Sequence, residues 1–377
     1  MADPDPRPLH GAGGARVQPA RRRAAGPPRP RGNSEQSDRG GGVAAVSARR
    51  IEALPDPATA SERRAWERLA AAEGLDPRRE PWCWHPAGRL LLRSARAQRL
   101  ATALGGDLAD AAIHARRAET WQVSASRCAL RQGPAHSAEQ ISQLRLGDRF
   151  RVWHWDAARE WAWGAGEDGY PGWLRAWHLR PGAPPPPTRV VCARWSRALV
   201  APSADAAPLL DLSFGTRLAP AGRPQAGYLP WQAPDGRRAW TALAPLAPWP
   251  LRTPGGAAGE LLGRGRALLG VPYEWGGASS AGLDCSGFVQ LLFGSLGRRL
   301  PRDADLQADC GHPVALDAPA RWAAGDLVFY GERRVDHVGI LAEGMALLHA
   351  SGELCLEPLG PDGRLRGRQP RLLRRLA

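Results

Sequence analysis

Hydrophobic and polar positions change their spacing several times along the chain, and each change indicates a boundary between segments. Residues 1–56 are rich in Pro, Gly and Arg and show no apolar period, so we expect a disordered tail there. Over residues 57–118, apolar residues recur at helical spacing, first around Trp66 and again from Leu90 to Leu104. This segment is therefore predicted to be helical, without an assigned role.

The middle of the chain has short alternating apolar runs broken by Gly, Pro and Asp, which is typical of β-strands. The segment around Gly147 recurs around Gly215, and an Asp-Gly pair followed by a Trp recurs at nearly the same spacing. A repeat made of short strands predicts two small β-barrels. We place the first at residues 119–182 and the second at residues 189–248, with a proline-rich linker between them.

The C-terminal third changes pattern again. One helix is predicted from Glu260 to Leu269, and a second begins after Asp284. Helices followed by a strand meander predict an α+β domain, which we place at residues 252–360, with a basic tail at residues 361–377. The strand-like runs of this domain are residues 326–330, 336–342 and 346–351.

The net charge of +14 raises the question of nucleic-acid binding. Most of the charge lies at the two ends, where residues 1–50 hold ten arginines against four acidic residues and residues 360–377 hold six against one. A nucleic-acid-binding domain needs its charge on a folded face. We therefore interpret the two ends as solvated tails and expect no nucleic-acid partner.

Six cysteines are spread along the chain without a Cys-x-x-Cys pair, so neither a structural zinc site nor a disulfide framework is expected. No apolar run approaches the ~18 residues of a membrane-spanning helix. The first residues are a poor secretory signal. These features favour a cytoplasmic protein with free thiols. A wrongly assigned start codon would leave a periplasmic or secreted location open.

Candidate chemistry centres on Cys285, which the sequence places in the first turn of a predicted helix with Asp284 as its cap. To be mostly ionised at neutral pH, a thiol needs a pKa about two units below its reference of ~8.5, which corresponds to ~2.7 kcal/mol. A helix N-terminus supplies only ~0.3–1 kcal/mol. A histidine partner is therefore required.

Two histidines, His337 and His349, lie on neighbouring predicted strands. With a three-residue loop at residues 342–344, Leu341 pairs with Met345, and the two histidines lie directly opposite each other on one face. With a two-residue turn at residues 343–344 they point to opposite faces. We predict the first register, in which His337 acts as base to the thiol and His349 holds its tautomer.

Several sequence motifs follow one another in this third of the chain: Pro272 to Gly277, Leu283 to Phe288, Leu300 to Asp303 with Gln307, Gly325 to Phe329, His337 to Ile340, and Leu348 to Ser351. They resemble the NlpC/P60 family of cysteine peptidases, with all blocks in family order. Earlier motifs, at residues 130–134 and 168–173, resemble the bacterial SH3-like (SH3b) domain. Two such domains before a peptidase domain resemble the γ-D-glutamyl-L-diamino acid endopeptidases of the dipeptidyl-peptidase VI type.

The resemblance implies a papain-like fold and a set of residue roles. Cys285 is the implied nucleophile, with His337 and His349 completing the triad. Tyr273 and the backbone N–H of the nucleophile would bind the oxyanion. The residues implied to bind the peptide are Asp284, Ser286 and Trp275, together with Glu139 and Tyr170, which the first barrel would lend to hold a free N-terminal amine.

Together these expectations describe a cysteine endopeptidase that cuts the γ-D-Glu to diamino acid bond of a murein peptide, L-Ala-γ-D-Glu-diamino acid, in peptidoglycan turnover or recycling. No cofactor is expected. Zinc ligation by the three triad residues is the metal alternative, and no His-Glu-x-x-His pair supports it. The alternative function is a wall-binding SH3b adaptor with an inert peptidase domain, and acyl transfer is a third. The sequence leaves open the diamino acid, the need for a free L-Ala and the oligomeric state.

Overall fold

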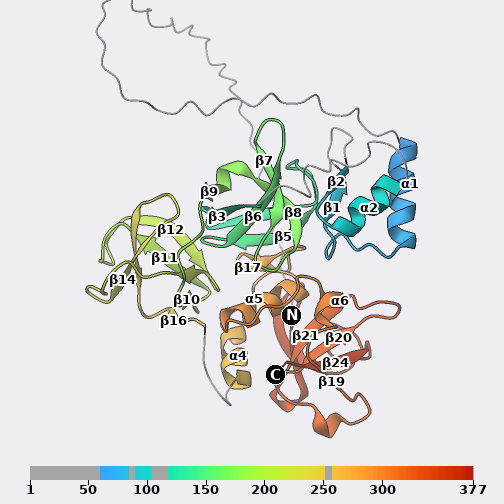
Figure 1. Ribbon diagram of the computed structural model, residues 1–377. Coiled ribbons are helices and arrows are strands. Elements are labelled where there is room, and N and C mark those ends of the chain that lie inside the picture. Colours follow the sequence, from blue (N-terminus) through green and yellow to red (C-terminus); the bar gives the residue numbers. More distant parts are fainter. Residues whose placement is uncertain (1–59, 85–89, 104–117, 251–256, 377) are drawn as a thin grey trace, which may run out of the picture. The chain divides into compact units, whose positions relative to one another are not determined.

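This computed structural model describes residues 60–84, 90–103, 118–250 and 257–376 (Figure 1). All of them belong to one compact unit of the chain. The tail expected over residues 1–56 lies outside the described residues and stays a prediction. No described helix is long and apolar enough to cross a membrane.

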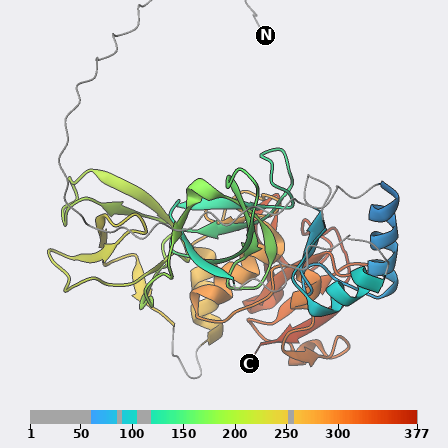
Figure 2. The ribbon, with the colours of Figure 1, turned by 45° about the horizontal axis from the view of Figure 1, so that its top comes forward.

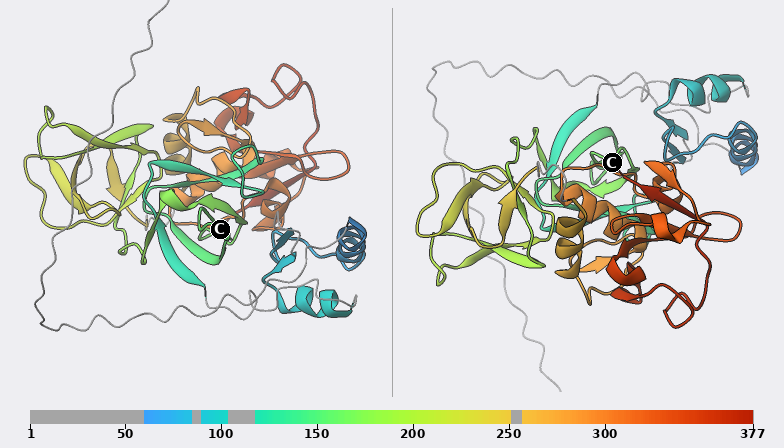
Figure 3. Two further views of the ribbon diagram at one scale, coloured as in Figure 1. Left: turned by 90° about the horizontal axis from the view of Figure 1, so that it is seen from above. Right: turned by 90° about the horizontal axis from the view of Figure 1, so that it is seen from below.

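Two helices and a hairpin come first, and Figure 3 shows the helices next to the hairpin in both views. Leu90 and Leu92 of the hairpin share a buried cluster with Trp66 of the first helix. Leu91 lies on the opposite face of its strand and packs against Trp153 of the next domain. The helix predicted to start at Leu90 was therefore wrong at its beginning, because these three leucines bury on two faces of a strand. The elements are α1 (Ala60–Ala72), β1 (Trp82–Trp84), β2 (Leu90–Leu92) and α2 (Ala95–Ala103).

Seven antiparallel strands form the first barrel, in the order β5-β4-β8-β7-β6-β3-β9. Figure 2 shows these strands curving around a common interior, which buries Val123, Phe150 and Leu174. The strands are β3 (Glu119–Val123), β4 (Arg127–Arg131), β5 (Gln140–Arg145), β6 (Arg149–Trp155), β7 (Trp161–Ala165), β8 (Pro171–Arg175) and β9 (Leu179–Pro181).

The next seven strands repeat most of these pairings but form two sheets, β13-β10-β16 and β12-β11-β15-β14, because β13 does not pair with β14 as β6 pairs with β7. β10 pairs with β13 and β16 just as β3 pairs with β6 and β9, and β11 pairs with β12 and β15 just as β4 pairs with β5 and β8. The repeated glycines Gly147 and Gly215 both have left-handed backbones, with φ of 76° and 81°. The sequence repeat thus corresponds to a repeated strand topology. The strands are β10 (Arg189–Val191), β11 (Trp195–Leu199), β12 (Pro208–Ser213), β13 (Arg217–Leu218), β14 (Tyr228–Gln232), β15 (Arg238–Ala242) and β16 (Leu246–Pro248).

The C-terminal domain packs its helices on one face of a six-stranded sheet of order β19-β24-β20-β21-β22-β23. Phe288 and Leu292 of helix α5 share a buried cluster with Ile340 and Leu348 of the sheet. This arrangement is the α+β domain that the sequence predicted. The elements are α4 (Ala257–Arg266), β17 (Ala278–Ser279), β18 (Gly282–Leu283), α5 (Cys285–Ser295), α6 (Ala304–Gln307), β19 (His312–Val314), β20 (Leu327–Tyr330), β21 (His337–Ala342), β22 (Ala346–Ser351), β23 (Glu353–Pro358) and β24 (Leu372–Arg375).

The basic tail predicted at residues 361–377 is instead part of this domain. Strand β24 lies between β19 and β20, and Leu373 within it is 1% exposed. Arg375 pairs with the buried Asp326 at 2.7 Å. The many arginines of this segment led to the wrong prediction. Asp326 neutralises the charge of Arg375, and Leu373 is buried in the domain.

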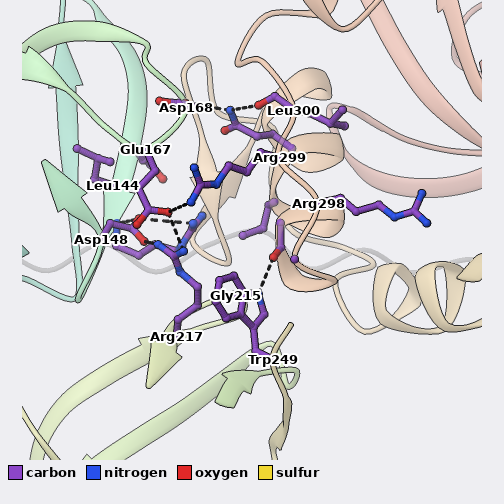
Figure 4. A pocket seen from close by; sticks show the side chains of 16 residues that line it. Leu144, Asp148, Glu167, Asp168, Gly215, Arg217, Trp249, Arg298, Arg299 and Leu300 are labelled. Carbon is purple, nitrogen blue, oxygen red and sulfur yellow. Dashed lines mark hydrogen bonds and ion pairs between the residues drawn. The ribbon is translucent and has the colours of Figure 1, made fainter. Parts of the chain in front are cut away.

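Arg217 of the second barrel links the two barrels. Its guanidinium lies 3.0 Å from Asp148 and 2.8 Å from Glu167, both in the first barrel (Figure 4). The Trp249 indole N–H donates to the Gly294 carbonyl of α5 at 3.0 Å. These contacts surround a pocket whose lining contains none of the three predicted triad residues, so we assign it a structural role.

Candidate active site

Cys285 is the first residue of α5 and is buried. The Asp284 carboxylate accepts the Gly287 N–H at 2.6 Å, so the predicted cap is confirmed. The backbone N–H groups of Val338 and Ser286 lie near the Cys285 sulfur and act to lower its pKa. Val338 directly follows His337, so the sulfur lies against the strand that carries the predicted base.

Burial raises the pKa of the Cys285 thiol to about 11, and the nearby Asp284 carboxylate adds to the rise. The two backbone N–H groups act in the opposite direction without overcoming it. The helix N-terminus therefore does not make a thiolate by itself, as the magnitudes indicated. A base must take the proton when a substrate is attacked.

The predicted register of the two histidine strands was wrong, although the shared face was right. Ala342 pairs with Ala346, which places His337 diagonal to His349 rather than directly opposite. The loop is residues 343–345, where Gly344 and Met345 both have left-handed backbones. Methionine seldom adopts that conformation, so the residue type did not indicate that Met345 lies in the loop. A shift of two residues in the pairing keeps both side chains on one face.

The two imidazoles are in direct contact. His337 Nε2 lies 2.9 Å from His349 Nδ1, which leaves the Nδ1 atom of His337 for another partner. Burial, followed by the effect of His349, lowers the pKa of His337 to about 3. Burial also lowers the pKa of His349, against a smaller opposing effect from Glu357. The free protein therefore holds neutral imidazoles, and His337 is in the state that can accept a proton.

Tyr273, the predicted oxyanion donor, lies near the thiol. Burial, and then the charge on the Cys285 sulfur, raise the pKa of Tyr273 to about 12. Its hydroxyl consequently keeps its proton at neutral pH, as a hydrogen-bond donor must. Its backbone N–H donates to the Gly352 carbonyl at 2.8 Å, which fixes this segment beside the end of β22.

Asp284 and Ser286, the predicted peptide-binding pair, are both bound to an arginine that the sequence analysis missed. Arg302 is 1% exposed. Its guanidinium contacts the Asp284 carboxylate at 2.5 and 2.9 Å, the Ser286 hydroxyl at 2.9 Å and, from the first barrel, the Ser142 hydroxyl at 2.9 Å. The signal was the arginine inside the Leu300 to Asp303 motif, which had no assigned role.

The first barrel contacts the segment that leads into the nucleophile. The buried Gln143 of β5 accepts the Ser279 hydroxyl at 2.8 Å and the Ala278 N–H at 3.2 Å, and its amide donates to Glu274. Next to it, the exposed Trp275 indole N–H donates to Glu139 at 2.7 Å. The predicted substrate residues Trp275 and Glu139 are thus brought together.

Tyr170, the second residue predicted from the first barrel, lies at a different segment of the C-terminal domain. Its hydroxyl donates to Asp303 at 2.9 Å. Asp303 also pairs at 2.8 Å with Arg78, which comes from the segment between α1 and β1. Asp303 and Arg78 are further polar residues of this region that the sequence analysis did not identify.

Two stretches of the chain match known families. Residues 270–359 match the NlpC/P60 family, and residues 130–179 match the bacterial dipeptidyl-peptidase SH3 domain. A γ-D-glutamyl-L-lysine dipeptidyl-peptidase of Bacillus subtilis (strain 168) is 33% identical over 186 residues, which is 48% of this chain and 60% of the relative. Peptidoglycan endopeptidase RipB of Mycobacterium tuberculosis is 35% identical over 102 residues, 24% of this chain and 41% of the relative. The chain thus spans less than two thirds of the curated relatives it matches.

A solved structure agrees with these matches at the level of the fold. The crystal structure of an NlpC/P60 family protein from Bacillus cereus ATCC 10987 aligns with a TM-score of 0.60 over 68% of this chain and 99% of its own length, at 21% identity. The papain-like fold that the resemblance implied is confirmed. The chain carries an NlpC/P60 domain at residues 270–359, preceded by an SH3 domain of the bacterial dipeptidyl-peptidase type at residues 130–179.

Proposed function

We propose that this chain is a cysteine endopeptidase that hydrolyses the γ-D-Glu to diamino acid bond of murein peptides. One observation carries the proposal. The strand whose Val338 N–H lies near the Cys285 sulfur begins with His337, and His337 Nε2 lies 2.9 Å from His349 Nδ1. A nucleophile, a base and a group that orients the base are the parts that acyl transfer through a thiol requires.

In the proposed first step, His337 Nδ1 takes the thiol proton while the Cys285 sulfur attacks the carbonyl carbon of the γ-D-Glu amide. Tyr273 and the Cys285 backbone N–H stabilise the negative oxygen of the tetrahedral intermediate. As that intermediate collapses, the bond to the diamino acid breaks and the departing amine takes the proton from His337. The peptide remains on the sulfur as a thioester.

In the second step, His337 takes a proton from water and the resulting hydroxide adds to the thioester carbonyl. The carbon–sulfur bond then breaks, the γ-carboxylate of the D-Glu leaves, and the thiol regains its proton. Two imidazoles kept neutral by burial suit both steps, because the base must be unprotonated each time it acts.

For the substrate we propose a released peptide with a free N-terminal amine, such as L-Ala-γ-D-Glu-diamino acid. Two separate contacts between the first barrel and the C-terminal domain supply polar groups for this amine: Glu139 at Trp275, and Tyr170 at Asp303. Carboxylates and a phenol oxygen suit a cationic amine. The relatives named γ-D-glutamyl-L-lysine dipeptidyl-peptidase favour testing lysine beside meso-diaminopimelate.

A peptide of this kind arises after wall material has been broken down, so we place the reaction in peptidoglycan turnover or recycling. We further propose a cytoplasmic location, on the basis of the six free cysteines. Fractionation of cells that produce the full chain tests the location directly, and recovery of the protein outside the cytoplasm would refute it.

Mass spectrometry of digests tests the activity. The protein is incubated with the free tripeptide, with its N-acetylated form and with intact sacculi. We expect L-Ala-D-Glu to be released from the free tripeptide at least about tenfold faster than from the blocked form, because acetylation removes the charge that would pair with the carboxylates; tenfold corresponds to about 1.4 kcal/mol. Sedimentation with sacculi and no hydrolysis of any substrate would favour the wall-binding adaptor instead.

A further inference from the structure

Glu357 ends a row of hydrogen-bonding groups that begins at the predicted base. His349 Nε2 lies 3.0 Å from the Glu357 carboxylate oxygen Oε1, and His349 Nδ1 lies 2.9 Å from His337 Nε2. Each ring nitrogen of His349 therefore has one partner. Neither the predicted triad nor the family motifs included Glu357.

The carboxylate fixes the direction of every hydrogen bond in this row. An ionised carboxylate only accepts, so the proton between His349 and Glu357 must sit on His349 Nε2. A neutral imidazole with that proton has an unprotonated Nδ1. His349 Nδ1 then accepts, so His337 Nε2 must donate. The Nδ1 atom of a neutral His337 is consequently unprotonated, as a base for the Cys285 thiol requires.

Without the carboxylate, His349 is free to carry its proton on Nδ1 instead. It would then donate to His337 Nε2, and a neutral His337 would carry its own proton on Nδ1. That nitrogen could no longer accept the proton of Cys285. The alternative tautomer thus removes the base without removing any residue of the triad.

We propose that Glu357 is a positioning residue which, through His349, holds His337 in the tautomer that can accept the Cys285 proton. This inference rests on the proposed function and extends it from three residues to four. Among the described residues, Glu357 is connected to His337 through His349 and has no contact with the Cys285 sulfur.

The fold holds Glu357 in place from two sides. His349 pairs with Cys355 across β22 and β23, so Glu357, two residues further along, points from the same face. The Arg364 backbone N–H donates to Glu357 Oε1 at 2.7 Å. A Cβ atom built on Gly363 would lie 2.8 Å from the same oxygen, so a larger residue there would displace the Glu357 carboxylate from this position.

The charged groups around the two histidines determine how strongly Glu357 can stabilise a proton on them. Arg364 and Arg368 disfavour a proton on the two histidines, whereas Glu357 and Asp336 favour one. The thiol of Cys355 also faces His349 and keeps its proton, because burial raises its pKa. When His337 becomes protonated during catalysis, Glu357 is the carboxylate connected to it through hydrogen bonds.

Glu357→Gln tests the proposal, with Glu353→Gln as the matched control. Glu353 lies on the same strand and pairs with Arg364 at 2.7 Å, but the structure gives it no bond to His349. We expect Glu357→Gln to lower kcat about 10- to 100-fold with KM within about twofold of wild type. The effect is smaller than the ~10⁴-fold loss when the aspartate of a serine protease triad is made an amide, because here an imidazole lies between. Equal kcat values for the two variants would overturn the proposal.

Alkylation of Cys285 separates this inference from the proposed function, because it needs no substrate. The rate at pH 7 is followed by mass spectrometry of the peptide that contains Cys285. We expect it to fall about tenfold in Glu357→Gln and to stay unchanged in Glu353→Gln. A wild-type protein that cleaves no murein peptide but shows this difference would reject the proposed substrate and keep the role of Glu357. Equal alkylation rates in both variants would reject that role.

Nitrogen NMR of the wild-type protein labelled on histidine makes the test independent of any effect of substitution on folding. The signals of His337 and His349 are assigned from single asparagine variants. We expect both rings to carry their proton on Nε2 at pH 7 to 8. A proton on Nδ1 of either ring contradicts the proposal.

Discussion

At the scale of single residues, the site is set by burial more than by attraction between charges. Burial raises the pKa of the Cys285 thiol and lowers that of His337, so both groups are neutral in the free protein near pH 7. The backbone N–H of Val338 and the row that ends at Glu357 are then the features that favour transfer of a proton from sulfur to nitrogen. The pair of Cys285 thiolate and His337 imidazolium therefore forms during the reaction and is not present in the free protein.

Burial of a neutral His337 makes stability depend on pH. The unfolded chain binds the proton near pH 6.5, whereas the folded protein binds it only near 3. The stabilisation is therefore present above pH 6.5 and is lost as the pH falls towards 3. Between pH 6.5 and 5 we expect the wild type to lose about 2 kcal/mol more unfolding free energy than His337→Asn.

Denaturant titrations at the two pH values measure this difference. His312→Gln is the control, because His312 is exposed on the edge strand β19. It should follow the wild type at both pH values. If His337→Asn and the wild type lose the same free energy, His337 is not a buried neutral base.

At the scale of secondary structure elements, strand β24 was the main feature that the sequence analysis did not identify. It contributes two short pairings, to β19 and to β20. Its only fully buried side chain among residues 372–375 is Leu373, which packs with Val328 and Tyr330 on the face of the sheet away from α5. A segment that the charge pattern assigned to solvent therefore completes the sheet behind the catalytic strands.

Leu373→Ala tests whether this strand is needed for the fold. Loss of a fully buried leucine typically costs about 2–5 kcal/mol, so we expect a fall of that size in the free energy of unfolding. Leu372→Ala, at the half-buried position beside it, should cost less than half as much. Equal and small effects for both variants, measured by denaturant unfolding, would mean that the C-terminal strand does not contribute to the domain.

The features predicted correctly from the sequence are those that depend on residues near one another in the chain. The cap of α5, the shared face of His337 and His349 and the repeat of the barrels follow from nearby residues, and all three are present in the structure. The register was missed because it depends on a methionine in a left-handed conformation. Arg302 was missed because folding brings its partners to it from two distant segments, the first barrel and the start of α5.

At the scale of the whole molecule, the first barrel forms part of the site region rather than a separate binding module. Ser142 reaches Arg302, Gln143 holds the segment before the nucleophile, and Tyr170 reaches Asp303. The segment before the barrel adds Arg78, which pairs with Asp303 and with Asp305. Substrate selection is therefore expected to depend on the attachment of the barrel to the peptidase domain.

Gln143→Ala tests this dependence. The substitution leaves the Ala278 N–H and the Ser279 hydroxyl without their acceptor, at a cost of about 1–3 kcal/mol, and removes one of the two amides that donate to Glu274. We expect faster hydrogen exchange over residues 274–283 and a higher KM for the free tripeptide. Gln232→Ala, an exposed glutamine of the second barrel that bonds within its own turn, is the control and should change neither. Unchanged exchange and KM in Gln143→Ala would show that the barrel is dispensable for the site.

The proposed activity requires the sulfur of Cys285 as the nucleophile, and the most direct measurement is the rate at which Cys285→Ala releases L-Ala-D-Glu from the free tripeptide. The variant should unfold at the temperature of the wild type or above, because the alanine leaves the cap by Asp284 intact. We predict a rate at least about 10⁴-fold below the wild type, as for other enzymes that lose their nucleophile. A folded Cys285→Ala protein that keeps a tenth or more of the wild-type rate would contradict the account.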